Sequence, residues 1–207
     1  MKIVFISDTH NKLSEVVVPP GDILIHAGDF TMLGKIEEFQ LFNKDLEKLP
    51  HKHKIVIAGN HEFLVEHNQK LGRAILSAAT YLQDESVVVE GLKIYGSPWQ
   101  PEFGRWAFNL PRNSPSLKLV WDKIPRDTDI LLTHTPPHGI LDKTNSGEKV
   151  GCEVLKQRLR DLTPRIHCFG HIHPAYGKKK VDKTLYINAA IVNDKYQPTN
   201  QPIVIEL

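Results

Sequence analysis

Short, continuously apolar runs recur along this chain of 207 residues, and they restrict its fold more than any other feature. Several of them, such as Lys2–Ile6, Ile23–Ala27 and Ile130–Thr133, show no alternation between apolar and polar residues. A strand of this kind is typically covered on both faces, as in a sheet packed between two other layers. We expect strands at 2–6, 23–27, 54–58, 87–90, 92–96, 130–133, 165–169, 184–188 and 203–207.

Helical patterns fall between some of these strands. Residues 34–49 place apolar side chains close to a 3.6-residue period, and further helices are predicted at 62–79, 116–123 and 150–162. Strands that alternate with helices indicate α/β layers, and the closer spacing of the later strands favours a second, partly antiparallel sheet. The segment 97–115 fits no regular element, and a loop of that length is often functional.

The composition is ordinary for one globular domain, here residues 1–207. Hydrophobic residues make up 41% and charged residues 24%, and the net charge of +2 predicts no affinity for polymeric nucleic acid or for an anionic membrane. No apolar run approaches the roughly 20 residues of a membrane span. The N-terminus lacks the longer apolar region of a signal peptide and is expected to form a core strand.

Two cysteines, Cys152 and Cys168, are too few for a disulfide framework. A single bridge between them is one interpretation. Two buried, reduced thiols are the favoured one, because they suit a cytoplasmic protein. We therefore expect a cytoplasmic location.

Polar, metal-competent residues directly follow five of the predicted strands. They are Asp8 and His10, then Asp29, then Asn60 and His61, then His134, and finally His171 and His173. Ligands of α/β sheets bind outside the carboxyl ends of the strands, so we expect these side chains to meet at one edge. The i, i+2 spacing of Asp8 and His10, and of His171 and His173, lets each pair point to the same side.

These ligand types indicate a site for two metal ions. Carboxylate, imidazole and amide oxygen together suit Mn²⁺, iron, Zn²⁺ or Co²⁺ better than Ca²⁺. The candidates are too many for one tetrahedral zinc, whereas two ions about 3.5–4 Å apart, bridged by a carboxylate, would use them all. Each motif alone is also explained as a helix cap, a turn or a core histidine. Their shared position after apolar strands favours the joint metal site.

The same residues resemble the five-block signature of the calcineurin-like metallophosphoesterases. The blocks are Asp8 with His10, Gly28-Asp29, Gly59-Asn60-His61-Glu62, His134, and Gly170 to His173. Further segments are similar to the metallophosphoesterase-domain-containing (MPPED) subgroup, and with them the resemblance covers nearly the whole chain. These segments are 96–103, 106–112, 150–153, 186–188 and 197–200.

This resemblance implies a four-layer α/β/β/α sandwich with two metals held by loops at one edge. By motif position, the first metal would be bound by Asp8, His10, Asp29 and His173. The second would be bound by Asp29, Asn60, His134 and His171, with Asp29 as the bridge. Mn²⁺ is the leading candidate, and iron, Zn²⁺, Co²⁺ or Mg²⁺ are alternatives. His61 would face the substrate, and Glu62 is expected to begin a helix.

These features predict a binuclear, metal-dependent phosphoesterase. A hydroxide bridging the metals would attack phosphorus, and His61 would assist the leaving oxygen as a general acid. Resemblance to the subgroup favours phosphodiesters, with cyclic nucleotides as candidates, over phosphomonoesters. A catalytically weak metal-binding scaffold for protein interactions on the same fold is the alternative. A purely structural zinc site fits poorly, because such sites are usually closed and cysteine-rich.

Substrate contacts are expected from Asn60, His61 and the loop 99–112, where Arg105 and Trp106 are the leading candidates. Aromatic faces could stack on a nucleobase and arginine could hold a phosphate. The aromatic residues of this loop are Trp99, Phe103, Trp106 and Phe108. The opposite interpretation, that they fill a small core, is equally favoured. The run Lys178–Lys180 is predicted to be a solvated turn, and His26 a structural residue.

Overall fold

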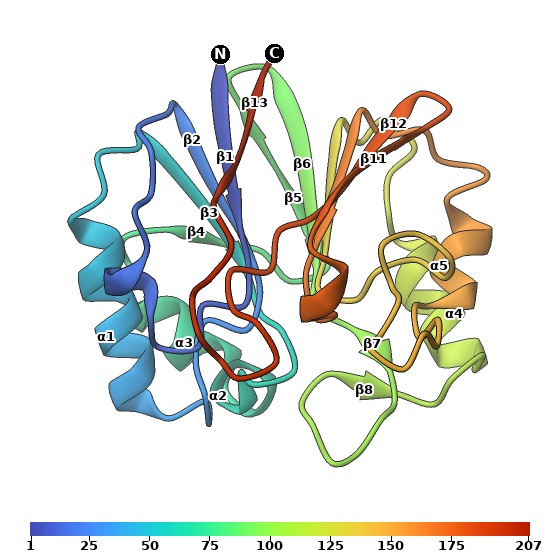
Figure 1. The fold of residues 1–207 in the computed structure, drawn as a ribbon, viewed down its shortest axis with the longest axis horizontal. Coiled ribbons are helices and arrows are strands. Elements are labelled where there is room, and N and C mark those ends of the chain that lie inside the picture. Colours follow the sequence, from blue (N-terminus) through green and yellow to red (C-terminus); the bar gives the residue numbers. More distant parts are fainter.

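Two β-sheets pack face to face between layers of helices in the computed structural model, which describes residues 1–207 (Figure 1). The first sheet has the strand order β13-β1-β2-β3-β4 and the second β11-β12-β10-β9-β6-β5. Their strands are β1 Lys2–Ile6, β2 Ile23–Ala27, β3 His53–Ile57, β4 Thr80–Tyr81, β5 Glu85–Val89, β6 Leu92–Ser97, β9 Ile130–Thr133, β10 Ile166–Phe169, β11 Gly177–Val181, β12 Thr184–Asn188 and β13 Ile203–Glu206. The predicted four-layer sandwich is confirmed.

Helices cover the outer face of each sheet (Figure 1). Those on the first sheet are α1 Ile36–Glu47, α2 Phe63–His67 and α3 Gln69–Ile75; those on the second are α4 Pro115–Asp122 and α5 Glu153–Arg158. Two 3₁₀ turns, η1 Leu13–Glu15 and η2 His173–Ala175, lie in loops. No helix combines the length and the hydrophobicity that crossing a membrane would require.

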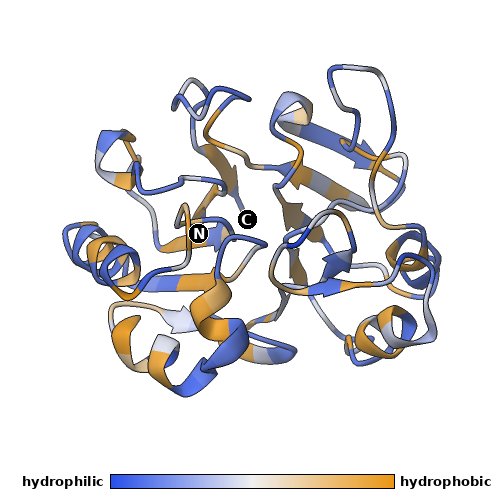
Figure 2. Ribbon diagram, turned by 90° about the horizontal axis from the view of Figure 1, so that it is seen from below, coloured by the Kyte–Doolittle hydropathy of each residue, from blue (hydrophilic) through white to orange (hydrophobic).

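Burial along β1 explains why this strand is continuously apolar. Ile3 and Phe5 lie in the core between the two sheets, whereas Val4 and Ile6 pack between the first sheet and its helices. A third core, which contains Trp121, fills the space between the second sheet and its helices. Because both faces of each sheet are covered, the central strands need apolar residues at successive positions. Figure 2 shows these mostly hydrophobic strands in the middle of the molecule.

The predicted strands agree with the structure to within two residues at either end. The second sheet is partly antiparallel, as expected, because β5 pairs antiparallel with β6 and β11 with β12. Cys152 and Cys168 are free and buried, which also agrees with the prediction. Within the long loop before α4, two short strands pair with each other, β7 Gln100–Pro101 and β8 Asn109–Leu110.

The single helix predicted at 62–79 is wrong. The chain instead forms α2 and α3, which are separated by Asn68, whose φ of −144° is not helical. The side chain of Asn68 accepts a hydrogen bond from the N–H of Leu71 at 3.1 Å and so caps α3. The helix predicted at 150–162 is also shorter than expected, because α5 begins only after Cys152 caps it.

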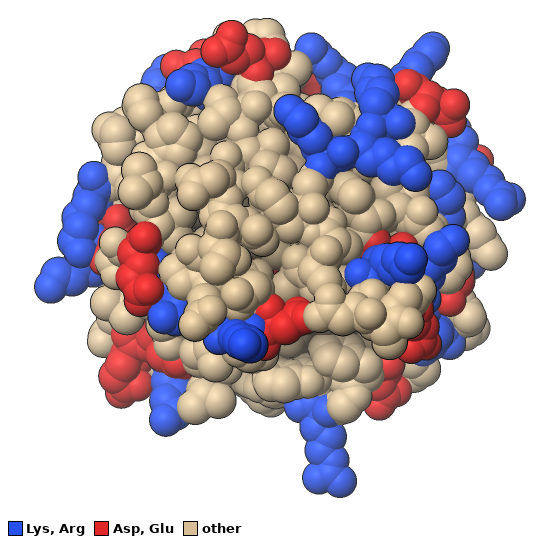
Figure 3. Space-filling view, viewed as in Figure 1, with Lys and Arg blue, Asp and Glu red and all other residues tan.

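The solvated turn predicted at Lys178–Lys180 is wrong as well. These residues belong to β11, which pairs with β12 at the edge of the second sheet. All three lysine side chains are exposed, and Figure 3 shows basic side chains gathered over this part of the molecule at the upper right. Lysines on an edge strand discourage pairing with another chain, which explains why a charged run is found in this strand.

The two chain ends meet at one side of the first sheet. β13 pairs antiparallel with β1, and the amino group of Met1 lies 2.7 Å from the carbonyl oxygen of Leu207. Both ends therefore lie beside the beginning of β1 (Figure 1). The carboxyl ends of β1, β2 and β3 lie at the opposite end of the sheet, where the candidate ligands follow.

Candidate metal centre

Loops after five strands bring the predicted ligands together from both sheets. Asp8 and His10 follow β1, Asp29 follows β2, Asn60 and His61 follow β3, His134 follows β9, and His171 and His173 follow β10. Pairing between neighbouring chain segments continues beyond the strands. The N–H of Asp8 donates to Gly28 O at 2.9 Å, and the N–H of Gly170 donates to His134 O at 3.1 Å. These bonds fix the turns from which the side chains project.

Four of these residues have left-handed backbone conformations. The φ angles are 52° at Asp8, 41° at His10, 56° at Asp29 and 68° at His171. Aspartate and histidine tolerate this region better than most residues, but it still carries strain, which tends to collect at functional sites. The strain here lies in the turns that aim the candidate ligands.

Gly170 allows the turns of the two sheets to approach closely. A Cβ atom at this position would collide with the carboxylate of Asp8 and the hydroxyl of Ser7. The space is used by the next residue, since the N–H of His171 donates to both carboxylate oxygens of Asp8 at 3.0 Å. This contact joins β1 of the first sheet to β10 of the second.

The ligand atoms form two adjoining groups. Asp8, His10 and His173 make one, Asp29, His134 and His171 make the other, and the atoms within each group lie within 4.8 Å of one another. Nε2 of His173 lies 3.4 Å from Asp8 Oδ1, and Nε2 of His134 lies 3.2 Å from Asp29 Oδ2. Asp29 Oδ2 is also 3.9 Å from Nε2 of His10, so this carboxylate stands between the groups.

Backbone carbonyls orient the histidines. Nδ1 of His10 lies 3.0 Å from Thr31 O, Nδ1 of His134 lies 2.9 Å from Ala27 O, and Nδ1 of His173 lies 3.3 Å from Asn193 O. A carbonyl only accepts, so each Nδ1 carries the proton, and in the neutral ring Nε2 keeps its lone pair. Such an outer hydrogen bond is typical of metal-binding histidines.

Two features show that a cation fits this donor set. Nε2 of His10 is buried and has no hydrogen-bond partner, and burying an unpaired polar atom is costly. Near Asp29, three acceptors converge, because Asn60 Oδ1 lies 3.0 Å and Asp29 Oδ2 3.2 Å from Nε2 of His134. Acceptors this close require a proton or a metal ion between them.

The charges of the site favour the same interpretation. Burial lowers the pKa of His134, but the charge of Asp29 and the hydrogen bond to it raise that pKa to about 9, so without metal a proton occupies Nε2. Burial lowers the pKa of His10 to about 4 despite the nearby carboxylates, which keeps its ring neutral. For Asp8, burial is outweighed by the hydrogen bond and charge of His173, and the pKa falls to about 2.

Glu62 ties the loops after β2 and β3 together. Its fully buried carboxylate accepts hydrogen bonds from the N–H groups of Asp29 at 2.9 Å, Gly59 at 2.6 Å and Thr31 at 2.9 Å. Glu62 occupies the N-cap position of α2, so its expected place at a helix start is confirmed, but its side chain makes no capping hydrogen bond to that helix. Burial and the charge of Asp29 raise the pKa of Glu62 to about 7, against the effect of these hydrogen bonds.

His61 lies between the candidate ligands and the long loop. Its N–H donates to Asp29 Oδ1 at 2.9 Å, and its Nδ1 lies 2.6 Å from Met32 O, which leaves Nε2 facing the site 3.9 Å from Asp29 Oδ2. The ring of Trp106 packs over it, with centroids 4.4 Å apart and planes 31° apart. His61 also forms a third close group with His10 and Asp29, so distance alone does not separate it from the ligands.

The aromatic residues of the loop 99–112 divide between the two predicted roles. Phe108 is fully buried in the core beneath α1, and Trp99 packs against it. Phe103 and Trp106 instead face the candidate centre, since the ring of Phe103 lies 4.9 Å from that of His171. Arg105 is exposed and its side chain forms no hydrogen bond or ion pair, so its contact with substrate stays a prediction.

One residue near the site escaped the sequence analysis. The ring of Tyr196 lies 4.8 Å from that of His10 and 5.7 Å from that of His173. It belongs to the loop after β12, directly before the segment 197–200. The only signal for Tyr196 in the sequence is its position next to residues 197–200, one of the segments that resemble the MPPED subgroup.

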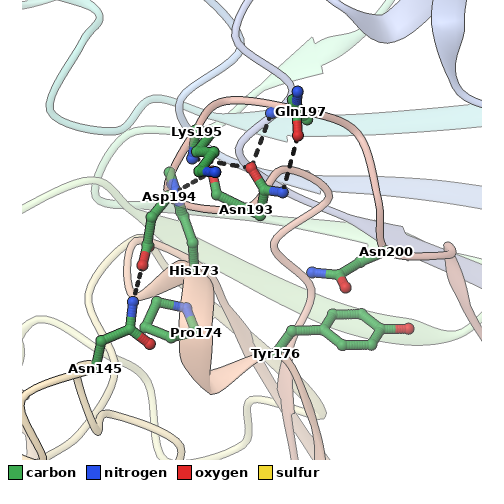
Figure 4. Close-up of a pocket in the computed structure, with 9 residues that line it drawn as sticks. All are labelled: Asn145, His173, Pro174, Tyr176, Asn193, Asp194, Lys195, Gln197 and Asn200. Atoms are coloured by element: carbon green, nitrogen blue, oxygen red, sulfur yellow. Dashed lines mark hydrogen bonds between the residues drawn. The ribbon is translucent and has the colours of Figure 1, made fainter.

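The same loop forms one wall of a polar recess of about 520 Å³ beside His173 (Figure 4). Asn193, Asp194 and Lys195 contribute side chains to it, and Asn145 lies on the facing loop. Asn145 donates a hydrogen bond to Asp194, which joins the two loops. The recess thus offers several hydrogen-bonding groups within reach of the candidate centre.

Several known proteins are similar to this chain. The model of the family described as calcineurin-like phosphoesterase matches residues 1–175. Human metallophosphoesterase domain-containing protein 1 is 44% identical over 231 aligned residues, which cover 100% of this chain and 71% of that protein. A UPF0046 protein of Caenorhabditis elegans is 41% identical, over 99% of this chain and 74% of that protein. The crystal structure of TT1561 of Thermus thermophilus has a TM-score of 0.60 at 13% identity, over 90% of this chain and 88% of that chain, and supports the fold alone.

Proposed function

Because the chain belongs to the calcineurin-like phosphoesterase family, we propose that it is a hydrolase that uses two divalent metal ions to cleave phosphodiester bonds. Membership of the family, together with the clustered histidines and aspartates, fits a metal-dependent phosphoesterase. The number of ions, the preference for diesters over monoesters, and the residues assigned below are the proposal. We take residues 1–207 as one catalytic domain.

The observation that carries the proposal is the arrangement around Asp29. Two groups of ligand atoms adjoin at this carboxylate, and a buried lone pair of His10 faces them without a partner. Asp8, His10, Asp29 and His173 would hold one ion; Asp29, Asn60, His134 and His171 would hold the other. Mn²⁺ is the leading candidate, since mixed carboxylate, imidazole and amide ligands suit it.

When bound, two divalent ions neutralise phosphate charge and make water acidic enough to serve as a nucleophile near neutral pH. The chain supplies the other steps. The carbonyl of Met32 fixes the His61 ring so that Nε2 faces the site, where it can donate a proton to the leaving oxygen. Trp106 limits the movement of that ring.

The surroundings of the centre favour a small phosphoester, with nucleotides, including cyclic nucleotides, as candidates. The polar recess beside His173 and the aromatic residues Phe103 and Trp106 adjoin the site from different loops. A cytoplasmic location remains part of the proposal and rests on the two reduced cysteines.

Hydrolysis by the reconstituted protein tests this function. Protein freed of metal with a chelator and reloaded with Mn²⁺ should cleave bis(p-nitrophenyl) phosphate faster than p-nitrophenyl phosphate. The Asp29→Ala variant, treated in the same way, provides the control for contaminating phosphatases. A Mn²⁺-loaded protein that cleaves neither ester would contradict the proposal and favour the metal-binding scaffold.

A further inference from the structure

A cavity of about 300 Å³ opens beside His171, on the side where the loop 99–112 meets the loop before α5. Its walls include the apolar side chains of Pro101, Phe103, Val150 and Ile172. Thr135 and Thr144 contribute to the lining as well. This cavity is distinct from the polar recess, which adjoins His173. It lies instead against His171, the other candidate metal ligand in the turn after β10.

The wall that carries Phe103 is held in place before any ligand arrives. Pairing of β7 with β8 closes the loop, and Gln100 Nε2 donates to Ala107 O at 3.2 Å across it. Asn109 Nδ2 donates to the carbonyl oxygen of Phe103 at 3.2 Å. The Phe103 side chain nevertheless remains 42% exposed, with its ring 4.9 Å from that of His171. A fixed, exposed aromatic ring beside a reaction centre is available surface for a ligand.

The charge of the cavity favours a neutral ligand group. Arg112 is the one arginine or lysine in its lining, and its guanidinium is already engaged. It donates to Glu153 Oε2 at 2.7 Å, to Gly151 O at 3.0 Å and to Val150 O at 2.8 Å. An anionic substituent would find no unpaired cation there, whereas an uncharged ring would bury apolar surface against Phe103 and Val150.

We propose that this cavity binds an uncharged planar ring, the size of a phenyl group or a nucleobase, carried by the phosphoester whose phosphate lies at the metal centre. The proposal rests on the proposed function, because it places the phosphate next to His171. Phe103 then acts as a specificity residue: it contacts the ring and contributes to binding rather than to bond cleavage.

Binding of two phosphonates that differ only in this ring tests the proposal. Phenylphosphonate and methylphosphonate are titrated calorimetrically into the Mn²⁺-loaded protein. Phenylphosphonate should bind about 10- to 50-fold more tightly, which is the gain expected from burying one phenyl ring. Equal affinities for the two compounds would overturn the proposal.

Two variants locate the ring. Phe103→Ala should reduce the phenyl preference at least about fivefold and leave methylphosphonate affinity unchanged, because only the ring contact is lost. Val150→Phe fills the cavity and should give the same loss, so the test does not depend on one variant folding well. Leu119→Ala, at an exposed position of α4, is the matched control and should keep the preference. A preference that survives both cavity variants would place the ring elsewhere.

The outcomes separate this inference from the proposed function. The calorimetric preference is measured without turnover, so a protein that cleaves no ester but still binds phenylphosphonate through Phe103 contradicts only the catalytic proposal. A protein that hydrolyses diesters yet shows no phenyl preference contradicts only the ring pocket.

Discussion

At the scale of single residues, the candidate centre depends on turns that strain the backbone to aim side chains. Asp8, Asp29 and His171 all have positive φ angles, and the first two are carboxylates buried among histidines. Such conformations persist only where the surroundings fix them. Here the hydrogen bonds from His171 N–H to Asp8, and from the Asp29 and Thr31 N–H groups to Glu62, provide that restraint.

Substitution of Asp29 and His61 should separate metal binding from proton transfer. Asp29→Ala removes the carboxylate shared by both groups and should abolish metal occupancy and turnover together. His61→Ala should keep the metal content and reduce turnover by roughly 10²- to 10⁴-fold, because it removes a general acid. Elemental analysis alongside kinetics distinguishes the two. Equal loss of metal in both variants would make His61 a ligand, which its closeness to His10 also allows.

Gly170→Ala should damage the site through one methyl group. The added Cβ would meet the Asp8 carboxylate, so either Asp8 or the β10 turn must move. Metal affinity should fall at least about tenfold, since a displaced ligand loses its geometry, and the melting temperature of the metal-free protein should drop too. Competition with a fluorescent chelator measures the affinity. Unchanged affinity would show that the turn adapts without moving Asp8.

The sequence revealed the side chains of the site because each follows an apolar strand, where parallel strands bring their carboxyl ends together. It could not reveal the carbonyls of Thr31, Met32 and Asn193 that orient the histidines, because every residue has a carbonyl. The position of Glu62 at the start of α2 is predicted by its neighbours, but its buried bonds to the β2 loop depend on tertiary structure and have no signal in the sequence.

At the scale of elements, the loop that contains β7 and β8 joins the site to the helical layer. It buries Phe108 in the core and presents Trp106 and Phe103 to the candidate centre. Trp99 and Phe108 pack in the core, and Phe103 and Trp106, which lie between them in the sequence, face the centre, so the aromatic content of this loop supported two interpretations.

Trp106→Ala should lower turnover without removing metal. The His61 ring would lose the face against which it packs, and a small misplacement of a catalytic group costs between about 10- and 100-fold in rate. Trp106→Phe should recover most of the activity because a flat ring remains. Steady-state kinetics with thermal unfolding checks both variants. A large loss of stability in Trp106→Ala would instead assign this residue to the core.

Two elements show where sequence patterns stop being informative. The apolar period of 62–79 continues through Asn68, but packing turns the chain there and Asn68 caps the next helix. The run of lysines in β11 is predicted to be a turn, because strands usually contain apolar or β-branched residues. They form an edge strand only because β12 supplies a partner, and that pairing cannot be inferred from three lysines.

At the scale of the whole molecule, the centre lies where two sheets meet, and it joins residues as distant in sequence as Asp8 and His171. Bound cations would therefore link the two sheets. The strand bounds, and the presence of layers on both faces of the strands, could be predicted from the continuously apolar runs. The way in which the sheets face each other was implied only by resemblance to a family.

The metal-free protein should lose stability as the pH rises from 7 to 9. The pKa of His134 is raised from 6.5 to about 9 and that of His173 is also raised, so their stabilisation is full below 6.5 and is lost as the pH passes the folded value. The loss for His134 is on the order of 3 kcal/mol. Bound Mn²⁺ requires the unprotonated rings and should flatten this slope. Denaturant unfolding at several pH values tests it; an identical slope with and without Mn²⁺ would contradict the assignment.

The meeting of the first and last strands has a practical consequence. Met1 and Leu207 lie within hydrogen-bonding distance, at the end of the first sheet that faces away from the candidate centre. A short peptide linker could join them, and the chain could be reopened at the exposed Asp182–Lys183 turn between β11 and β12. Such a circular permutant would keep every metal-ligand candidate on unbroken segments. Its new chain ends would lie at that turn, where an affinity tag or a fluorescent reporter could be attached.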